Sequence, residues 1–317
     1  MLMNNNFVQQ AIIIASSALL LTFFIFFPYY RTAHSSSTDQ NLFPEQKPLS
    51  ILFDLNGVLF RISKKRALSH LGFLDMLSYV ASGNKPNQLK NKVFTLLHRL
   101  RGHDALTYLP QETDTLTPMH DGVALPEIMC DWMRGIVPGH EIMKAMNELI
   151  ETLDQQQFFT SEREKRLIKR INVMMFDPAV RLQLYVPIRN GIRLLKLCKK
   201  RGNKVYLLSN MDSELIKLLE KKYPDSFGLF DGTIVSADVK MIKPDNGIYL
   251  HAIKAHNIDP ATCWLVDDQI ENILGAEQAG IQALQFSAKT ALSVRQTLMA
   301  KGMQMGVKPK KKVKKAA

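Results

Sequence analysis

The sequence predicts an α/β protein with a doubly wound parallel sheet and a mostly helical domain inserted after the first strand. Five short apolar runs are each followed by a helical period. Runs that are apolar on both faces are typical of parallel strands covered by crossover helices. The long stretch between the first two runs has helical periods and no strand series. The runs are Ser50–Phe53, Val205–Leu208, Thr233–Val235, Trp264–Val266 and Ile281–Leu284.

The chain begins with an apolar segment, and no charged side chain occurs from Met1 to Tyr30. About 20 apolar residues form roughly 30 Å of helix, enough to cross a bilayer. No Lys or Arg occurs in residues 1–10, which disfavours a secretory signal peptide. We therefore predict a single-pass membrane anchor over residues 1–31, embedded through residues 7–30. Secretion after signal cleavage and a buried core helix are the alternatives.

Basic residues follow this segment and none precede it, which predicts that the body of the protein lies on the cytoplasmic side. Residues 32–48 are rich in Ser, Thr, Gln and Pro and have no apolar period, so they are interpreted as a tether.

The parallel-sheet core is assigned to residues 49–61 and 186–290, and the helical insertion, or cap, to residues 62–185. In the core, Ile192–Arg201 has a helical period that ends before Gly202. In the cap, apolar residues recur on one helical flank at Leu89, Val93, Leu96, Leu97 and Leu100. The cap is rich in methionine. We interpret its methionines as ordinary core residues in preference to an adaptable substrate surface.

Residues 291–317 are predicted to be a final helix end and a basic tail. The formal net charge is +12, but Lys301 and six later lysines supply seven positive charges without an acidic residue among them. The rest of the chain is only mildly basic, so we expect no nucleic-acid partner. The tail could contact an anionic membrane surface. Three widely separated cysteines without a CxxC pair fit a reducing compartment.

Polar residues directly follow three of the buried runs, and a lysine lies in the segment between the third and the fourth run. Because the carboxyl ends of parallel strands meet at one edge of a sheet, these residues are expected to converge. Carboxylates offer the hard oxygen ligands that Mg²⁺ prefers, and a lysine offsets the charge of a phosphate. The residues are Asp54, Ser209, Asn210, Lys243, Asp267 and Asp268.

Four segments resemble the motifs of haloacid dehalogenase-like (HAD) hydrolases in order and spacing. They are ILFDLNGVLF, VYLLSN, KMIKPDNGIY and WLVDDQIENILGAEQAGI. The position of the insertion matches the subfamily with a helical cap. The fourth motif is similar to glucose-1-phosphate phosphatase-like members and to the amino-terminal phosphatase domain of soluble epoxide hydrolases. The resemblance implies a Rossmann-like core and hydrolysis of a small phosphorylated metabolite.

The resemblance implies that Asp54 is the nucleophile and forms an aspartyl-phosphate. The carboxylates of Asp54 and Asp268 and the backbone carbonyl of Asn56 would hold Mg²⁺. Asp267 would complete the metal site by supporting Lys243 or a metal-bound water.

The phosphoryl group has its own implied contacts. Ser209 and the amide of Asn210 would hold it, and Lys243 would neutralise its charge.

Two positions depart from the family pattern. Most family phosphatases have an aspartate at position 56 as general acid and base, a role worth roughly 10²–10⁴-fold in rate. An amide cannot carry that proton, so we expect slow turnover or a restriction to good leaving groups. Lys240 stands where relatives often have glycine, which alters a turn.

Two other functions remain open. A dehalogenase would attack carbon with Asp54 and need no metal, but the pair Asp267 and Asp268 argues against it. A non-catalytic, membrane-tethered binding module is suggested by Asn56 together with the anchor and the tail.

Overall fold

The computed structural model describes residues 48–100, 119–120 and 123–301. The predicted anchor, nearly all of the tether and the lysine-rich tail beyond Lys301 lie outside these residues. Within the described ranges, no helix combines the length and apolar composition that crossing a membrane requires.

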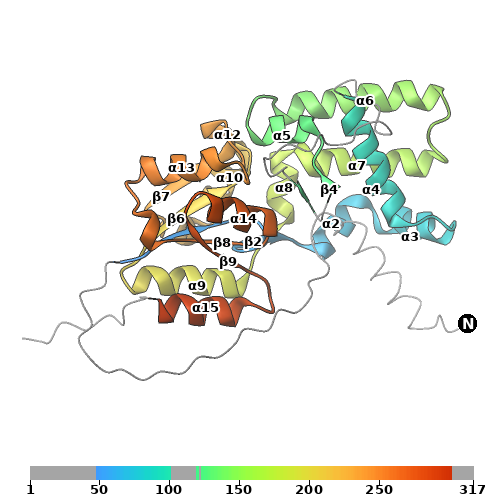
Figure 1. Cartoon of the computed structure of the whole chain (residues 1–317). Helices are drawn as coiled ribbons and strands as arrows, with labels where there is room; N and C mark the ends of the chain where they lie inside the picture. Colours follow the sequence, from blue (N-terminus) through green and yellow to red (C-terminus); the bar gives the residue numbers. More distant parts are fainter. Residues whose placement is uncertain (1–47, 101–118, 121–122, 302–317) are drawn as a thin grey trace, which may run out of the picture.

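A five-stranded sheet forms the centre of the larger domain, in the order β7-β6-β1-β8-β9 (Figure 1). All neighbouring strands are parallel, and Phe53 of β1 pairs in register with Leu207 of β6 and Val266 of β8. This confirms the predicted α/β class with a parallel sheet. The strands are β1 (Ser50–Phe53), β6 (Lys204–Ser209), β7 (Gly232–Val235), β8 (Cys263–Asp267) and β9 (Gln282–Gln285).

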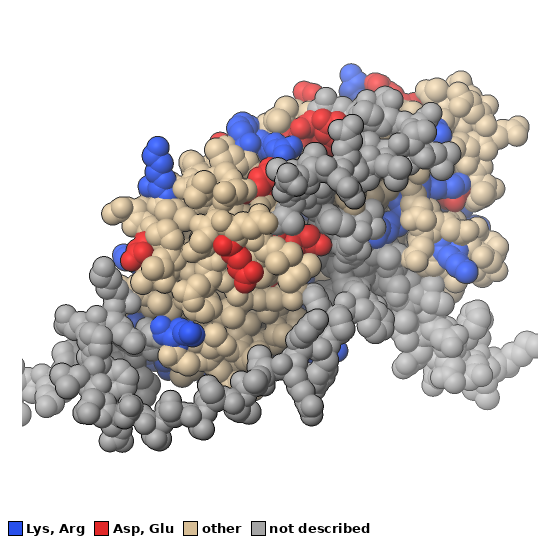
Figure 2. Space-filling model, viewed as in Figure 1, with Lys and Arg blue, Asp and Glu red and all other residues tan. Residues whose placement is uncertain are grey.

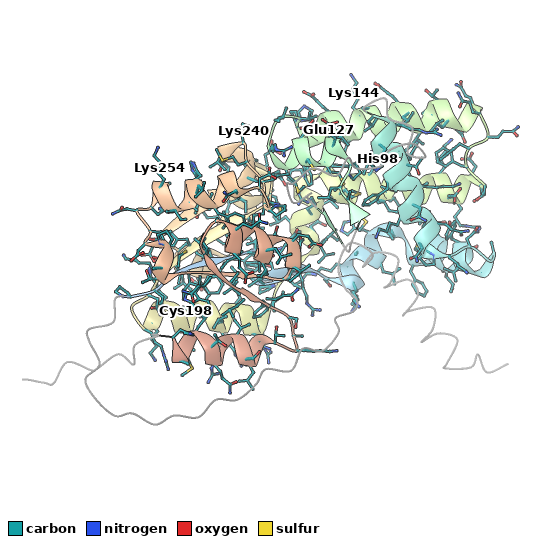
Figure 3. The ribbon with its side chains drawn as sticks, viewed as in Figure 1. His98, Glu127, Lys144, Cys198, Lys240 and Lys254 are labelled. Atoms are coloured by element: carbon teal, nitrogen blue, oxygen red, sulfur yellow. The ribbon has the colours of Figure 1, made fainter. Side chains whose placement is uncertain are left out.

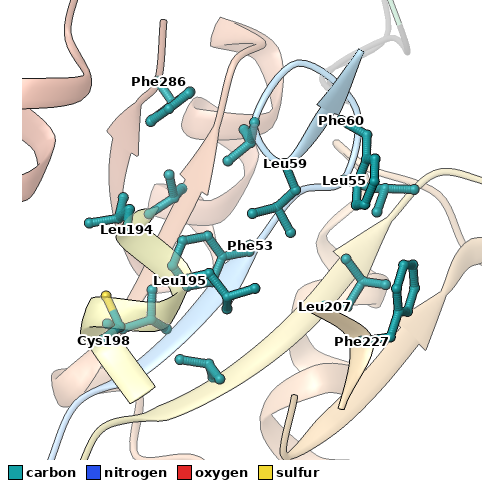
Figure 4. Close-up of a cluster of buried hydrophobic side chains, with 14 of the residues drawn as sticks. Phe53, Leu55, Leu59, Phe60, Leu194, Leu195, Cys198, Leu207, Phe227 and Phe286 are labelled. Carbon is teal, nitrogen blue, oxygen red and sulfur yellow. The ribbon is translucent and has the colours of Figure 1, made fainter. Parts of the chain in front are cut away.

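Helices cover both faces of this sheet. One face packs against α9, α10 and α15, and the other against α13 and α14; Figure 1 shows α9 and α15 below the sheet and α13 above it. In Figure 4, Phe53 lies among Leu194, Leu195 and Cys198 of α9. The bounds are α9 (Arg189–Lys200), α10 (Ser213–Lys222), α11 (Pro224–Phe227), α12 (Ser236–Val239), α13 (Asn246–Ala255), a 3₁₀ turn (Pro260–Thr262), α14 (Ile270–Gln278) and α15 (Ala291–Ala300).

The smaller domain is the helical cap. It has its own apolar cluster, to which α4, α6 and α7 contribute many fully buried side chains. A two-residue ribbon of β3 (Met119–His120) and β4 (Val123–Ala124) was not predicted. The helices of the cap are α2 (Lys64–Leu71), α3 (Phe73–Ala81), α4 (Pro86–Arg99), α5 (Glu127–Met133), α6 (Gly139–Gln155), α7 (Glu162–Phe176) and α8 (Pro178–Leu184).

The two domains are connected by a short antiparallel ribbon of β2 (Phe60–Ile62) and β5 (Tyr185–Pro187), in which Arg61 pairs with Val186. This ribbon carries the chain out of the sheet domain and back into it. On the face seen in Figure 2, acidic and basic side chains of the described residues are interspersed over both domains.

Candidate active site

The loop after β1 brings Asp54 to the carboxyl edge of the sheet. The backbone N–H of Asp54 donates to the Val266 carbonyl at 2.9 Å, which continues the ladder between β1 and β8. The next residues turn sharply: the N–H of Gly57 donates to the Phe60 carbonyl at 2.8 Å, and Gly57 has a φ of +84°. Glycine adopts that conformation without steric cost. The turn therefore places the side chains of residues 54 and 56 in the same polar site.

Lys243 is buried between two carboxylates. Its Nζ lies 2.6 Å from Asp54 Oδ1 and 2.6 Å from Asp267 Oδ2, and it donates to the Leu208 carbonyl at 3.1 Å. The lysine side chain is 1% exposed. An ammonium group has three donors and no acceptor, so these contacts use all of them.

Asn210 holds the backbone of Lys243 in place. Its side-chain Nδ2 donates to the Lys243 carbonyl at 2.8 Å, and its Oδ1 accepts from the Lys243 N–H at 2.8 Å. The side-chain amide is thus engaged within the protein and positions the lysine.

Asp267 is a fully hydrogen-bonded carboxylate. Oδ1 accepts from the Gln269 N–H at 2.9 Å and from Asn272 Nδ2 at 3.0 Å, and Oδ2 accepts from Lys243 and from Asn272 Nδ2 at 3.1 Å. Both oxygens are therefore occupied by donors. This geometry favours a supporting role for Asp267 towards Lys243 over direct coordination of a cation.

Three other polar atoms of the site are buried without a hydrogen-bond partner: Asn56 Oδ1, Ser209 Oγ and Asp268 Oδ1. Buried polar groups in proteins are normally paired, so each of these calls for an explanation. Carboxylate oxygens of Asp54, Asp267 and Asp268 lie within 4.8 Å of one another. Three carboxylates against one lysine leave negative charge in excess. The donor set and the unpartnered Asp268 oxygen fit a hard divalent cation such as Mg²⁺.

The pKa values reflect this excess of negative charge. Burial raises the pKa of Asp54 to about 6, with a further increase from Asp267 and an opposing effect of Lys243. Burial and the neighbouring carboxylates Asp267 and Asp54 also raise the pKa of Asp268 well above its usual value. Burial alone would lower the pKa of Lys243, but the two carboxylates outweigh it and raise that pKa. A divalent cation would favour the ionised forms of Asp54 and Asp268, the two carboxyl groups whose pKa is raised.

The polar site opens into a cavity of about 170 Å³ at the contact between sheet domain and cap. Asp54, Asn56, Ser209, Asn210 and Lys243 all line it. Asp267 and Asp268 are not among the lining residues: Asp267 is completely buried behind the lysine, and Asp268 lies against Gly57. The structure thus brings the predicted site residues together in two layers, one that lines the cavity and one that lies behind the lining.

The cap is held against the sheet domain by direct contacts. Ser236 Oγ donates to the Met133 carbonyl at 2.6 Å and accepts from the Met211 N–H at 2.9 Å. Lys240, labelled at the boundary between the domains in Figure 3, donates to the Gly135 carbonyl at 2.8 Å. Lys240 has a φ of +61°, so a non-glycine residue adopts the left-handed conformation at the position that departs from the family pattern.

Two site residues received no role from the sequence. Asn272 stands five residues after Asp267, and its position in α14, directly after β8, was a usable signal. Arg181, in α8, lines the cavity and pairs with Asp212, the N-cap of α10. No pattern in the sequence connects Arg181 with Asp212 because the contact depends on how the cap docks.

Comparisons with known proteins find hydrolases and phosphatases among the proteins similar to this chain. A family model described as haloacid dehalogenase-like hydrolase matches residues 50–280. A sesquiterpene phosphatase of Aspergillus oryzae is 34% identical over 106 residues, which are 32% of this chain and 53% of that protein. A D-glycero-beta-D-manno-heptose-1,7-bisphosphate 7-phosphatase of Haemophilus ducreyi is 48% identical over 40 residues, or 13% of this chain and 22% of that protein. The chain thus spans about half the length of the first relative and less of the second.

Among solved structures, a HAD family enzyme of Bacteroides thetaiotaomicron, in complex with magnesium and inorganic phosphate, is similar. It is 19% identical and covers 76% of this chain and 95% of its own, with a TM-score of 0.45.

Proposed function

The chain belongs to the haloacid dehalogenase-like hydrolases, and we propose that within this family it is a Mg²⁺-dependent phosphatase or phosphotransferase with Asp54 as its nucleophile. The observation that carries the proposal is the placement of Lys243. Its ammonium group lies 2.6 Å from a carboxylate oxygen of Asp54 and 2.6 Å from one of Asp267. Lys243 and Ser209 both line the cavity. One carboxylate oxygen of Asp54 is oriented by the lysine, which leaves the other to attack phosphorus.

The proposed reaction has two displacements at phosphorus. Asp54 forms a bond to the phosphoryl group while the bond to the leaving oxygen breaks, and water then hydrolyses the aspartyl-phosphate to release inorganic phosphate. Lys243 neutralises charge on the phosphoryl oxygens, and Ser209 Oγ donates to one of them. The Asn210 side chain is already hydrogen-bonded to the backbone of Lys243. We therefore assign the contact between Asn210 and the phosphoryl group to the Asn210 backbone N–H.

The cation site is proposed to consist of Asp54, Asp268 and the backbone carbonyl of Asn56. Asp267 supports it indirectly by holding Lys243. When bound, Mg²⁺ would offset the repulsion between the carboxylates and an incoming phosphate. The support for this assignment is the unpartnered, buried Oδ1 of Asp268 beside Asp54.

Dehalogenation is less well supported by the same contacts. An aspartate that attacks carbon needs no cation, whereas this site groups three carboxylates, pairs two of them with one lysine and leaves one carboxylate oxygen unpartnered. A charge excess of this kind favours a site built for a cation and a phosphate.

The test is phosphate release from acetyl phosphate, which has a good leaving group, by the purified protein with Mg²⁺. We expect release with Mg²⁺, no release with a chelator, and no release by Asp54→Asn. Borohydride trapping of the phosphorylated aspartate should mark Asp54 in the wild type and not in the variant. Metal-independent release of chloride from a haloacid, without phosphate release from acetyl phosphate, would contradict the proposal.

We also propose that residues 1–31 anchor this hydrolase in a membrane, with the catalytic domain in the cytoplasm. The support is the uncharged apolar segment and the basic residues that follow it. The full chain should stay with membranes during alkaline extraction, whereas a chain without these residues should be released. Equal release of both chains would contradict the anchor.

A further inference from the structure

The cavity at the active site has one polar end and a long apolar wall. The polar end consists of the residues proposed to bind the phosphoryl group. The cap and its connecting ribbon contribute mainly apolar side chains, together with Arg181 and Tyr185. The apolar side chains are Ile62, Phe94, Leu125, Met129, Trp132, Met133, Met174 and Met175.

Half of this wall is methionine, which the sequence alone favoured as core filling. Met129, Met133 and Met174 are at most 9% exposed and belong to the cap cluster, yet they also line the cavity. Methionine is unbranched and polarisable, so a wall of this kind adapts to apolar groups of irregular shape. The methionine-rich surface is therefore both core and cavity lining.

Trp132 is held rigidly within this wall. Its ring makes an edge-on contact with Phe176 at a centroid distance of 5.0 Å. The Arg181 guanidinium lies 4.6 Å from the centre of the Trp132 ring. A fixed aromatic ring offers an apolar contact surface at little cost in conformational entropy.

The only charged side chain that the described part of the cap adds to the lining is already paired. Arg181 forms an ion pair with Asp212, and its Nη2 contacts Met211 Sδ at 2.9 Å. Among the described residues, the wall therefore lacks an unpaired charge that could recognise the hydroxyl groups of a sugar phosphate. A polyhydroxylated substrate would lose hydration against the apolar side chains, and few described polar groups beyond Tyr185 and Gln269 could replace those hydrogen bonds.

From this division of the cavity we infer that the substrate is the phosphate monoester of a bulky apolar alcohol. The inference rests on the proposed phosphatase function, because it takes the polar end as the phosphoryl site. The phosphate occupies that end, and the hydrocarbon lies against the methionines, Phe94 and Trp132. Burial of apolar surface against this wall supplies the selectivity over small polar phosphates.

Alkyl phosphonates test this inference without depending on turnover, because their C–P bond is not hydrolysed. Binding of the series from methyl to decyl phosphonate to the Mg²⁺-loaded full chain would be measured by calorimetry, and inhibition of acetyl phosphate hydrolysis in parallel. We expect affinity to rise about two- to fourfold per added methylene until the cavity is filled. A polyhydroxylated phosphonate of equal length should bind at least about tenfold more weakly.

Substitutions then assign the effect to the cavity. Met175→Gln places an amide of similar size in the wall and should flatten the dependence of affinity on chain length, whereas Met175→Leu should retain it. Met299→Gln makes the same exchange at another half-buried methionine, on α15 and outside the cavity lining, and should retain the dependence as well.

The outcomes separate the two proposals. Equal affinity for short and long phosphonates, or an unchanged dependence in Met175→Gln, would overturn the apolar substrate class even if acetyl phosphate is hydrolysed. Affinity that rises with chain length in a protein without acetyl phosphate hydrolysis would support the apolar cavity and refute the phosphatase.

Discussion

Lys243 is the residue on which the buried charge of the site depends. It is the cation that faces both Asp54 and Asp267, and all three side chains are less than a tenth exposed. Lys243→Met should lower the free energy of unfolding in metal-free buffer by about 3–5 kcal/mol, because it leaves two buried carboxylates without a counter-charge. Urea denaturation measures the loss.

Two variants control this result. Adding Asp267→Asn to Lys243→Met should recover part of the stability, because one of the uncompensated charges is removed. Lys169→Met breaks a solvent-exposed ion pair with Glu151 and should change stability much less than Lys243→Met does. Equal effects of Lys243→Met and Lys169→Met would refute the role given to the buried lysine.

Asn56 limits the reaction if a proton must reach the leaving group. Its side-chain oxygen is buried without a partner, and the residue lines the cavity close to Asp54. Asn56→Asp supplies a proton carrier and should raise turnover roughly 10²-fold or more for alkyl phosphates, which have poor leaving groups. The gain should be much smaller for acetyl phosphate. Phosphate release at saturating Mg²⁺ measures both.

Two further comparisons interpret that experiment. Asn56→Ser keeps the backbone carbonyl and supplies no carboxyl group, so it should not reproduce the gain. An equal gain on both substrates would show that the leaving group is not what limits turnover.

The carboxyl groups make the effect of Mg²⁺ on stability dependent on pH. Burial raises the pKa of Asp54 from 3.8 to about 6, so the folded protein binds this proton more tightly than the unfolded chain. In metal-free protein this group therefore disfavours folding increasingly as the pH rises through that interval. Mg²⁺ competes with the proton, so it should raise Tm more at about pH 7.5 than at about pH 5.

Thermal unfolding with and without Mg²⁺ at the two pH values measures this difference. Asp268→Asn should abolish most of the Mg²⁺ effect while leaving the metal-free protein at least as stable, since it removes a partly buried carboxylate that has one unpartnered oxygen. A Mg²⁺ effect that is largest at the lower pH would contradict the assignment of these carboxylates to a cation.

At the scale of elements, the sheet was predictable because buried parallel strands have short, continuous apolar sequences. Ser50–Phe53 is both the predicted and the observed extent of β1, and β9 is displaced by one residue from the predicted Ile281–Leu284. The convergence of Asp54, Lys243 and Asp267 followed from the rule that parallel strands end at one edge. The order of the four sequence motifs predicted the other residues of the polar site.

The apolar end of the site was not predictable in the same way. Met129 and Met174 lie on different helices, and each also packs in the cap cluster, so their spacing indicates burial and nothing more. Whether a buried methionine faces a cavity depends on the docking of the cap on the sheet domain. Docking is set by contacts between distant segments, such as Ser236 with Met133, that leave no period in the sequence.

The turn after β1 tests how closely an element positions the cation site. A Cβ at Gly57 would lie 2.1 Å from Asp268 Oδ2, so Gly57→Ala must displace that carboxylate. Gly83→Ala is the matched control, because Gly83 has the same φ of +84° and nothing within 4 Å of the added carbon. Both variants should lose about 1 kcal/mol to backbone strain.

Only Gly57→Ala should also weaken Mg²⁺ binding and phosphate release, by tenfold or more. Urea denaturation and Mg²⁺ titration distinguish the shared loss from the specific one. If Gly83→Ala impaired Mg²⁺ binding as much as Gly57→Ala does, the carboxylate contact would not be the cause.

At the scale of the molecule, the active site exists only where two separately packed bodies meet. The sheet domain supplies the polar end and the cap supplies the apolar wall. Ile242, from the sheet domain, is completely buried in the cap cluster, one residue before Lys243. The same loop also pairs Asp245 with Arg134 of the cap at 3.3 Å. The loop that carries Lys243 is therefore also the loop on which the cap rests.

Ile242→Ala is expected to loosen this docking. It removes buried methylene groups and leaves a cavity between cap and loop, at a cost of about 2–5 kcal/mol. Ile248→Ala is the control, since Ile248 is equally buried but packs only within the sheet domain. Hydrogen exchange should become faster in α5 relative to β6 in Ile242→Ala, because the cap opens without unfolding of the sheet. Ile248→Ala should instead speed exchange in the sheet domain first. The same exchange pattern in both variants would mean that cap and sheet domain open as one unit and that Ile242 has no special part in docking.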